Sequence, residues 1–254
     1  MLERIDVYYD GWGEHWQWGT LVSSTAITGR PLIAFEFSDQ ALRRGLELSA
    51  LRLPLKGPKL RKDFPSHQMG LPGPVYDSLP DGWGMLLMDR FFLRERGIDR
   101  RAITALDRLA YMGDRAMGAL EYRPVLEKSE ADSSLDLERL YQAALEVYEG
   151  DTETTLDALR LAGGSPAGAR PKVVVALSQD KQRCASSFKT LAEGYEHWLV
   201  KFRAPDEHRD TGAIEYAYAQ MARRAGVEMA EPALLKVQMP NGAVGKVIEE
   251  VIKK

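Results

Sequence analysis

The sequence has a single cysteine, Cys184, among its 254 residues, so no disulfide can form within the chain. One free thiol is typical of proteins in a reducing compartment, and we expect Cys184 to be a buried or half-buried side chain rather than a reactive one. The four histidines, His15, His67, His197 and His208, are too scattered to form a metal site. The sequence therefore predicts neither a disulfide framework nor a histidine and cysteine metal centre.

Long hydrophobic runs are missing as well. No stretch reaches the roughly 20 apolar residues that a membrane helix needs, and the N-terminus does not have the pattern of a signal peptide. The 34 basic and 37 acidic residues leave a formal charge of −3, which gives no overall attraction to nucleic acid or to an acidic membrane. We therefore expect a cytoplasmic protein with no membrane partner.

Two common catalytic signatures are also absent. No Gly-x-Ser-x-Gly elbow is present, which removes the nucleophile of an α/β-hydrolase. The Walker A pattern Gly-x-x-x-x-Gly-Lys-Ser/Thr does not occur either, which argues against a P-loop nucleotide site.

The first third of the chain has the pattern of a small antiparallel sheet. Residues 5–9 alternate between the two faces of a strand, the glycines of segment 10–13 predict a turn, and residues 16–23 complete a hairpin. A third strand is predicted at 33–37. Prolines between residues 54 and 74 predict a long irregular section.

This irregular section holds the one local basic cluster of the sequence. Its members are Arg52, Lys56, Lys59, Arg61 and Lys62. A nucleic-acid contact is one interpretation, but we favour a solvated loop face because such charge runs usually face water.

Helical periodicity begins near residue 81. Asp81 can cap a helix that runs to Leu93 and ends at Gly97, although Gly82 and Gly84 weaken its first turn. We interpret these glycines as a tight docking of the helix start against another backbone, with Trp83 as a core anchor. A second helix at 103–111 and a short strand at 119–122 follow.

A polar stretch at 126–134 is the best candidate for a domain boundary, which predicts domains at 1–128 and 129–254. The second domain begins with an amphipathic helix at 135–148, and another helix after Thr152 reaches Leu159. Downstream, the pattern predicts strands at 173–177, 184–189, 197–202 and 233–238 and a helix at 212–225.

The most informative segment of the second domain is Gly-Gly-Ser-Pro-Ala-Gly-Ala-Arg-Pro-Lys at 163–172, a glycine-dense turn that leads into a strand. Glycines let backbone N–H groups approach an anion closely. Lys201 lies inside a later strand, and Glu215 falls in the first turn of the helix that follows. A loop, a strand lysine and a helix glutamate are the parts of a nucleotide-phosphate clamp of the protein-kinase kind. Two plainer alternatives remain open: a simple helix-to-strand turn, and an edge-strand lysine whose ammonium group reaches water.

Longer motifs resemble the HipA family of serine/threonine kinases. Tyr-Asp-Ser-Leu-Pro-Asp-Gly-Trp-Gly at 76–84, Tyr-Met-Gly-Asp-Arg at 111–115 and Gly-Ala-Leu at 118–120 are similar to the family's N-terminal subdomain. The loop with Ser165 and Lys172, the strand His-Trp-Leu-Val-Lys-Phe at 197–202 and Glu215 resemble its phosphate loop, nucleotide lysine and helix glutamate. The resemblance extends to about residue 235.

This resemblance implies a toxin of a bacterial toxin–antitoxin pair that uses ATP with Mg²⁺ to phosphorylate aminoacyl-tRNA synthetases. A HipB-like helix-turn-helix antitoxin would bind it, and contact with DNA would occur only through that antitoxin. Ser165 would be the autophosphorylated loop serine, and Pro166 departs from the residue usual there. The residues implied to hold the nucleotide are Ala167, Gly168, Ala169, Arg170, Lys172, Lys201 and Glu215.

The end of the sequence departs from the family. Family members continue through a hinge into a helical lobe with the catalytic aspartate, its asparagine partner and a metal-binding aspartate, whereas the apolar tail at 245–254 resembles no such hinge. Glu249 and Glu250 on this tail are no substitute, so we assign no catalytic or metal-binding residue in this chain. We therefore expect a truncated or split HipA-like kinase that is inactive alone and binds ATP weakly or not at all.

Two functions remain open from the sequence. The chain is either the ATP-facing part of a kinase that needs a separate C-terminal lobe, or a non-catalytic module that holds an antitoxin or such a lobe. The expected fold is α+β, with a small antiparallel-sheet subdomain and helices packed on an incomplete kinase-like N-lobe.

Overall fold

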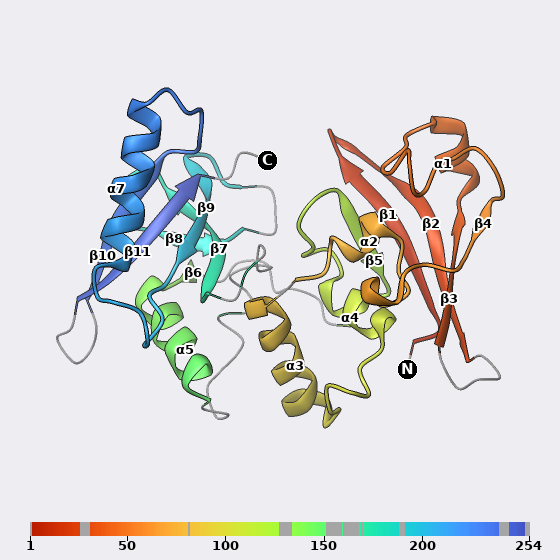
Figure 1. Cartoon of the computed structure of the whole chain (residues 1–254), viewed down its shortest axis with the longest axis horizontal. Coiled ribbons are helices and arrows are strands. Elements are labelled where there is room, and N and C mark those ends of the chain that lie inside the picture. The colour runs from red at the N-terminus through yellow and green to blue at the C-terminus, as the bar shows by residue number, and fades with distance from the viewer. Residues whose placement is uncertain are drawn as a thin grey trace. The chain divides into compact units, whose positions relative to one another are not determined.

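The computed structural model describes residues 2–25, 31–80, 82–126, 134–150, 159, 168, 170–187, 191–238 and 244–251. They form helices and two antiparallel sheets, which confirms the predicted α+β class (Figure 1). The chain divides into two compact units. The first unit comprises Met1–Leu79 and Phe91–Lys128, and the second comprises Pro80–Arg90 and Ser129–Lys254. Within the described ranges, no helix is both long and apolar enough to span a bilayer.

The first unit is built on a five-stranded sheet in the order β4-β3-β2-β1-β5. The strands are β1 Arg4–Gly11, β2 Glu14–Thr25, β3 Pro31–Phe37, β4 Leu60–Arg61 and β5 Leu120–Arg123. The predicted hairpin is confirmed, because β1 pairs with β2 across a turn at Trp12 and Gly13. Ile5, Val7 and Tyr9 alternate along β1 and are all buried, so one face of this sheet carries the core.

Short helices connect these strands. They are α1 Asp39–Arg44, the 3-10 helix η1 Ser66–Gln68, α2 Gly73–Tyr76 and α4 Ala105–Met112. Helix α4 confirms the helix predicted at 103–111. Its start is fixed by Thr104, whose Oγ1 accepts a hydrogen bond from the Asp107 N–H at 3.1 Å, while Asp107 Oδ2 accepts one from the Thr104 N–H at 3.1 Å. In the proline-rich section 54–74, all of it described, regular structure is limited to β4, η1 and the start of α2.

Helix α3 comprises Gly82–Arg96. Gly97 has a φ of 63° and its N–H donates to the Leu93 carbonyl at 3.1 Å, which ends the helix as predicted. The predicted cap, Asp81, lies outside the described residues. At the helix start, the Trp83 N–H donates to the Gly168 carbonyl at 3.1 Å and the indole is buried. The interpretation of this start as a docking against another backbone, with Trp83 as anchor, is confirmed.

The second unit contains a six-stranded sheet in the order β10-β11-β9-β7-β8-β6. Its strands are β6 Ser134–Leu135, β7 Lys172–Ser178, β8 Cys184–Ser186, β9 Tyr195–Lys201, β10 Pro232–Gln238 and β11 Val244–Val251. The four predicted strands are present. Strand β8 ends at Ser186, and residues 188 and 189 of the predicted strand lie outside the described residues.

Strand β11 corrects the sequence analysis, which treated residues 245–254 as a tail. Residues 252–254 lie outside the described residues, and β11, Val244–Val251, pairs antiparallel with β10 on one side and with β9 on the other. Its valines and isoleucine favour a strand, and residues 248–250 pair with both neighbouring strands. The segment is thus an inner strand of the sheet.

Two longer helices accompany this sheet, α5 Leu137–Glu149 and α7 Thr211–Arg224. Leu140, Ala144 and Val147 of α5 share a buried core with Val200 and with the other core members Val173, Val175, Cys184, Trp198 and Phe202. The expectation that Cys184 is buried is confirmed. The helix predicted to reach Leu159 lies outside the described residues except for Leu159 itself, which belongs to this core.

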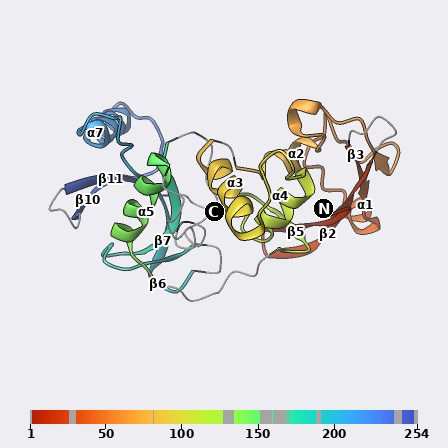
Figure 2. The same ribbon diagram turned by 90° about the horizontal axis from the view of Figure 1, so that it is seen from below.

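Successive residues of a strand face opposite sides of the sheet, so the residue after Val200 points away from α5. That residue is Lys201, and its ammonium group contacts Glu215 of α7. Helix α7 lies beside β10 and β11 (Figure 2). The strand lysine and the helix glutamate therefore belong to the face of the sheet opposite the α5 core.

Candidate functional site

The site begins with two lysines on neighbouring inner strands. Lys201 at the end of β9 is directly opposite Lys172 at the start of β7 and, on its other side, opposite Ile248 of β11. Residues opposite one another in an antiparallel pair share a face, and like charges in that position destabilise the sheet. Lys172 is buried, and the side chain of Lys201 is 19% exposed. Two largely buried cations on one face require negative charge nearby.

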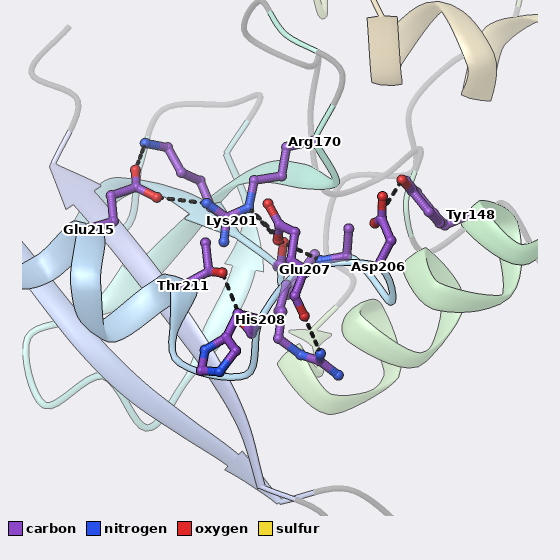
Figure 3. Close-up of polar contacts among 11 residues, drawn as sticks. Tyr148, Arg170, Lys201, Asp206, Glu207, His208, Thr211 and Glu215 are labelled. Carbon is purple, nitrogen blue, oxygen red and sulfur yellow. Dashed lines mark hydrogen bonds and ion pairs between the residues drawn. The ribbon is translucent and has the colours of Figure 1, made fainter.

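Glu215 supplies part of this negative charge from the first turns of α7 (Figure 3). Its Oε1 accepts a hydrogen bond from Lys201 Nζ, and its Oε2 accepts one from Arg170 Nη1 at 2.7 Å. Burial on its own raises the pKa of Glu215, but the hydrogen bonds and charges of Lys201 and Arg170 outweigh it. The pKa of this carboxyl therefore lies below its ordinary value of 4.5, and the group is ionised at neutral pH.

Arg170 connects the end of the glycine-rich segment to two other elements. Besides Glu215, it contacts Glu207, whose Oε2 lies 3.2 Å from Arg170 Nε, and the Phe202 carbonyl, which accepts from the same nitrogen at 3.2 Å. Glu207 is itself held in place, because its Oε2 accepts from the Ala204 N–H at 2.9 Å. Arg170 Nη2 is buried and has no hydrogen-bond partner within the part of the chain that the structure describes. Arg170 thus fixes the chain at β7 to the turn after β9 and to α7.

The backbone conformation at position 168 explains why this residue is glycine. Its φ is 113°, a region that L side chains rarely adopt, and a Cβ at this position would lie 2.5 Å from Lys172 Nζ. The ammonium group of Lys172 therefore lies against the bare backbone of Gly168. A residue with a side chain at position 168 would displace this ammonium group.

The structure brings together part of the predicted set. Arg170, Lys201 and Glu215 are in direct contact, and Lys172 lies between Gly168 and Lys201. The other predicted residues, Ser165, Ala167 and Ala169, lie outside the described residues. The assignment of any of these residues to a nucleotide stays a prediction.

Glu207 belongs to the site and the sequence analysis missed it. It lies in the turn between β9 and α7, in Arg-Ala-Pro-Asp-Glu at 203–207, where acidic residues are usually solvated. The available signal was its position two residues after a proline in the short connection between the lysine strand and the glutamate helix. Sequence alone does not say which of the two adjacent carboxylates, Asp206 or Glu207, turns inward. In the structure Asp206 accepts a hydrogen bond from the Tyr148 hydroxyl at 3.1 Å instead (Figure 3).

Comparison with protein families gives two matches. The HipA N-terminal domain matches residues 10–123, and the HipA-like C-terminal domain matches residues 164–248. The chain belongs to the HipA family. The second match contains every residue of the site, from the glycine-rich segment to Glu215, and most of β11.

The HipA family is generally associated with HipB antitoxins, which places this HipA-family chain in a toxin–antitoxin context. No curated protein matches the chain.

Proposed function

We propose that this HipA-family chain binds the phosphate groups of ATP between its glycine-rich segment and β9. The observation that carries the proposal is the cationic set Arg170, Lys172 and Lys201, with Lys201 oriented by Glu215. A lysine on a strand paired with a glutamate on the adjacent helix is the arrangement by which protein kinases position nucleotide phosphates. Lys201 would contact the α and β phosphates, and Lys172 and the Gly168 backbone would face the rest of the triphosphate.

Charge balance supports an anionic ligand at this place. Arg170, Lys172 and Lys201 bring three basic side chains to the site, and Glu207 and Glu215 bring two carboxylates. Among the described contacts, Glu207 pairs with Arg170, and Glu215 pairs with both Arg170 and Lys201. Mg²⁺ would arrive with the nucleotide and neutralise charge on its phosphates.

We extend the proposal to a HipA-like serine/threonine kinase toxin, with an aminoacyl-tRNA synthetase as its substrate and Ser165 as its own phosphorylation site. A phosphate on Ser165 would add close to two negative charges beside the proposed position of the ATP phosphates, and would compete with them. The antitoxin partner would be HipB-like, and DNA would be reached through it. The printed residues contain no catalytic-loop motif, so nucleotide binding and phosphoryl transfer need separate tests.

Saturation-transfer NMR with Mg-ATP tests binding, because it detects the weak affinity that we expect. Transfer to ATP protons should be clear for the wild type and reduced for Lys201→Ala. The control is Lys59→Ala, which removes one lysine charge from the first unit and should leave the transfer unchanged. Equal signals for all three proteins, or no signal for the wild type at any ATP concentration, would refute a phosphate site at Lys201.

A second candidate function is a non-catalytic module that binds an antitoxin or a separate kinase lobe. It is favoured by Ile214, Tyr218 and Met221, which are 51%, 68% and 62% exposed and lie along one face of α7. Transfer of the γ-phosphate, measured with the purified chain alone and with a candidate C-terminal lobe, separates the two functions. Transfer that appears only with the added lobe supports a divided kinase, whereas binding without transfer supports the module. Phosphate on Ser165 with this chain alone would contradict our expectation of inactivity.

A further inference from the structure

The first unit contains a cavity of about 1000 Å³ that the proposed function does not use. It is lined from four segments, within residues 48–53, 61–68, 72–78 and 117–120. Leu53 and Leu120 at its wall are buried, and Phe64 and Met117 add further apolar surface. A volume of this size fits a drug-sized organic molecule, whereas a stable protein interface needs a much larger flat area.

Charge at this cavity is mixed but mainly positive. Arg52, Arg61 and Lys62 line it, together with the carboxylates Asp63 and Asp77. These three cations belong to the basic cluster that the sequence analysis singled out. Their position at a cavity wall distinguishes them from the rest of that cluster.

Of the remaining cluster members, Lys59 is occupied by carboxylates. Its Nζ lies 2.9 Å from Asp39 Oδ1 and 3.4 Å from Glu36 Oε1. Lys56 is exposed and does not line the cavity. The cluster is therefore divided between a surface ion-pair group and a cavity wall, an arrangement unlike a continuous nucleic-acid face.

Arg61 is held rigidly at this wall. Its Nη2 donates to the Pro54 carbonyl at 2.6 Å and to the Lys56 carbonyl at 2.9 Å. Gly57 makes room for it, since a Cβ there would lie 3.2 Å from both terminal nitrogens of the guanidinium. Its Nε is buried and has no hydrogen-bond partner in the described part of the chain. Because this nitrogen is shielded from solvent, a ligand in the cavity would meet the charge of the fixed guanidinium and not this N–H group.

We infer that this cavity binds a small organic anion, an apolar body that carries one carboxylate, sulfonate or phosphate group. The apolar walls would hold the body, and the fixed charge of Arg61, together with Arg52 and Lys62, would attract the anionic group. The inference concerns the first unit alone and does not depend on the proposed ATP site.

The fluorescent probe 8-anilinonaphthalene-1-sulfonate, an aromatic body with one sulfonate, tests this inference in titrations of the full chain. Arg52 and Lys62 are exposed residues at the cavity wall, and Lys62→Glu and Arg52→Glu should each weaken binding by about tenfold. Lys56→Glu is the matched control, because it reverses the same charge in the same segment away from the cavity. It should leave the dissociation constant unchanged. Ser49→Trp, which occupies part of the cavity, should weaken binding of the probe without a change of charge.

The neutral probe N-phenyl-1-naphthylamine has the same aromatic body without the sulfonate and separates charge from apolar contact. Its binding should be equal in the wild type and Lys62→Glu. Equal binding of the anionic probe to the wild type and both cavity variants would overturn the inference, as would an equal loss with Lys56→Glu. Circular dichroism of each variant confirms that the fold is retained, and Ser49→Trp provides a test that removes no charge.

Discussion

Lys59 in the first unit and Lys201 in the second both pair with carboxylates, but their surroundings differ. Lys59 joins Asp39 and Glu36 where its own side chain is 41% exposed and that of Asp39 is 73% exposed. The side chains of Lys201 and Glu215 are 19% and 32% exposed, and Arg170 adds a second cation to the same carboxylate. Water screens the first pair and largely leaves the second unscreened.

The difference shows what each pair can do. An exposed pair gains little, because solvated charges lose hydration and side-chain freedom when they meet. A partly buried pair has already lost hydration, so removal of one partner leaves a charge without compensation. The Lys201–Glu215 pair therefore fixes the position of an ammonium group, whereas the Lys59 pair is a solvated ion pair on the surface.

The largest effect is expected for Glu215→Ala. This change leaves Lys201 and Arg170 without their shared carboxylate, and Lys201 remains opposite Lys172. We expect the free energy of unfolding to fall by about 2 kcal/mol, between the ranges typical of buried and exposed pairs. Urea unfolding at neutral pH measures it, with Glu215→Gln as a control that keeps the shape and removes the charge. A loss below about 0.5 kcal/mol for Glu215→Ala would place this pair in the same class as that of Lys59.

A smaller effect is expected for Arg170→Ala, a loss of about 1 kcal/mol in the free energy of unfolding. Glu215 would still pair with Lys201, and Glu207 would still accept the hydrogen bond from the Ala204 N–H. Arg170→Lys should restore only part of the loss, since one ammonium group cannot reproduce the fork that reaches both carboxylates. Arg209→Ala is the matched control from the same unit, because its side chain is 86% exposed and lies 3.6 Å from Asp210. Full recovery with lysine would show that the charge of residue 170 matters and its geometry does not.

Acidification should reduce the contribution of the Lys201–Glu215 pair to the free energy of unfolding. The pKa of Glu215 is lower in the folded chain than its ordinary value of 4.5, so the folded state favours the ionised carboxylate. The stability that this provides is complete above pH 4.5 and is lost as the pH falls through the lower folded pKa. The difference in unfolding free energy between the wild type and Glu215→Gln should therefore shrink on acidification. A difference that stays constant, or grows, over this range would contradict the lowered pKa.

The sequence predicted elements whose signal is local. The β1–β2 hairpin, the α3 end at Gly97 and the burial of Trp83 all follow from alternation, glycine position or an unusual helix start. The contact between Lys201 and Glu215 also agrees with the pattern of a strand lysine followed by a helix glutamate. In each case a few neighbouring residues carry the information.

What the sequence did not predict depends on partners far along the chain. Strand β11 lies between β10 and β9. Its short apolar sequence predicts a strand at most, and does not indicate with which strands it pairs. The role of Glu207 depends on the position of the Arg170 guanidinium, and Arg170 lies 37 residues earlier in the sequence. Arg61 is similar, because its buried Nε and its two carbonyl acceptors are set by the path of an irregular loop.

The smallest effect completes the comparison. Lys59→Ala and Asp39→Ala should each leave the urea midpoint unchanged, because both side chains are well solvated in the pair. The hydrogen bond with Asp39 raises the pKa of Lys59 and that with Lys59 lowers the pKa of Asp39, yet exposure to water and salt screens what these shifts contribute to stability. Parallel measurements in low and high salt test this directly. If Lys59→Ala destabilised the chain as strongly as Glu215→Ala, exposure would not be the property that separates the two pairs, and the special role of Lys201 would need another cause.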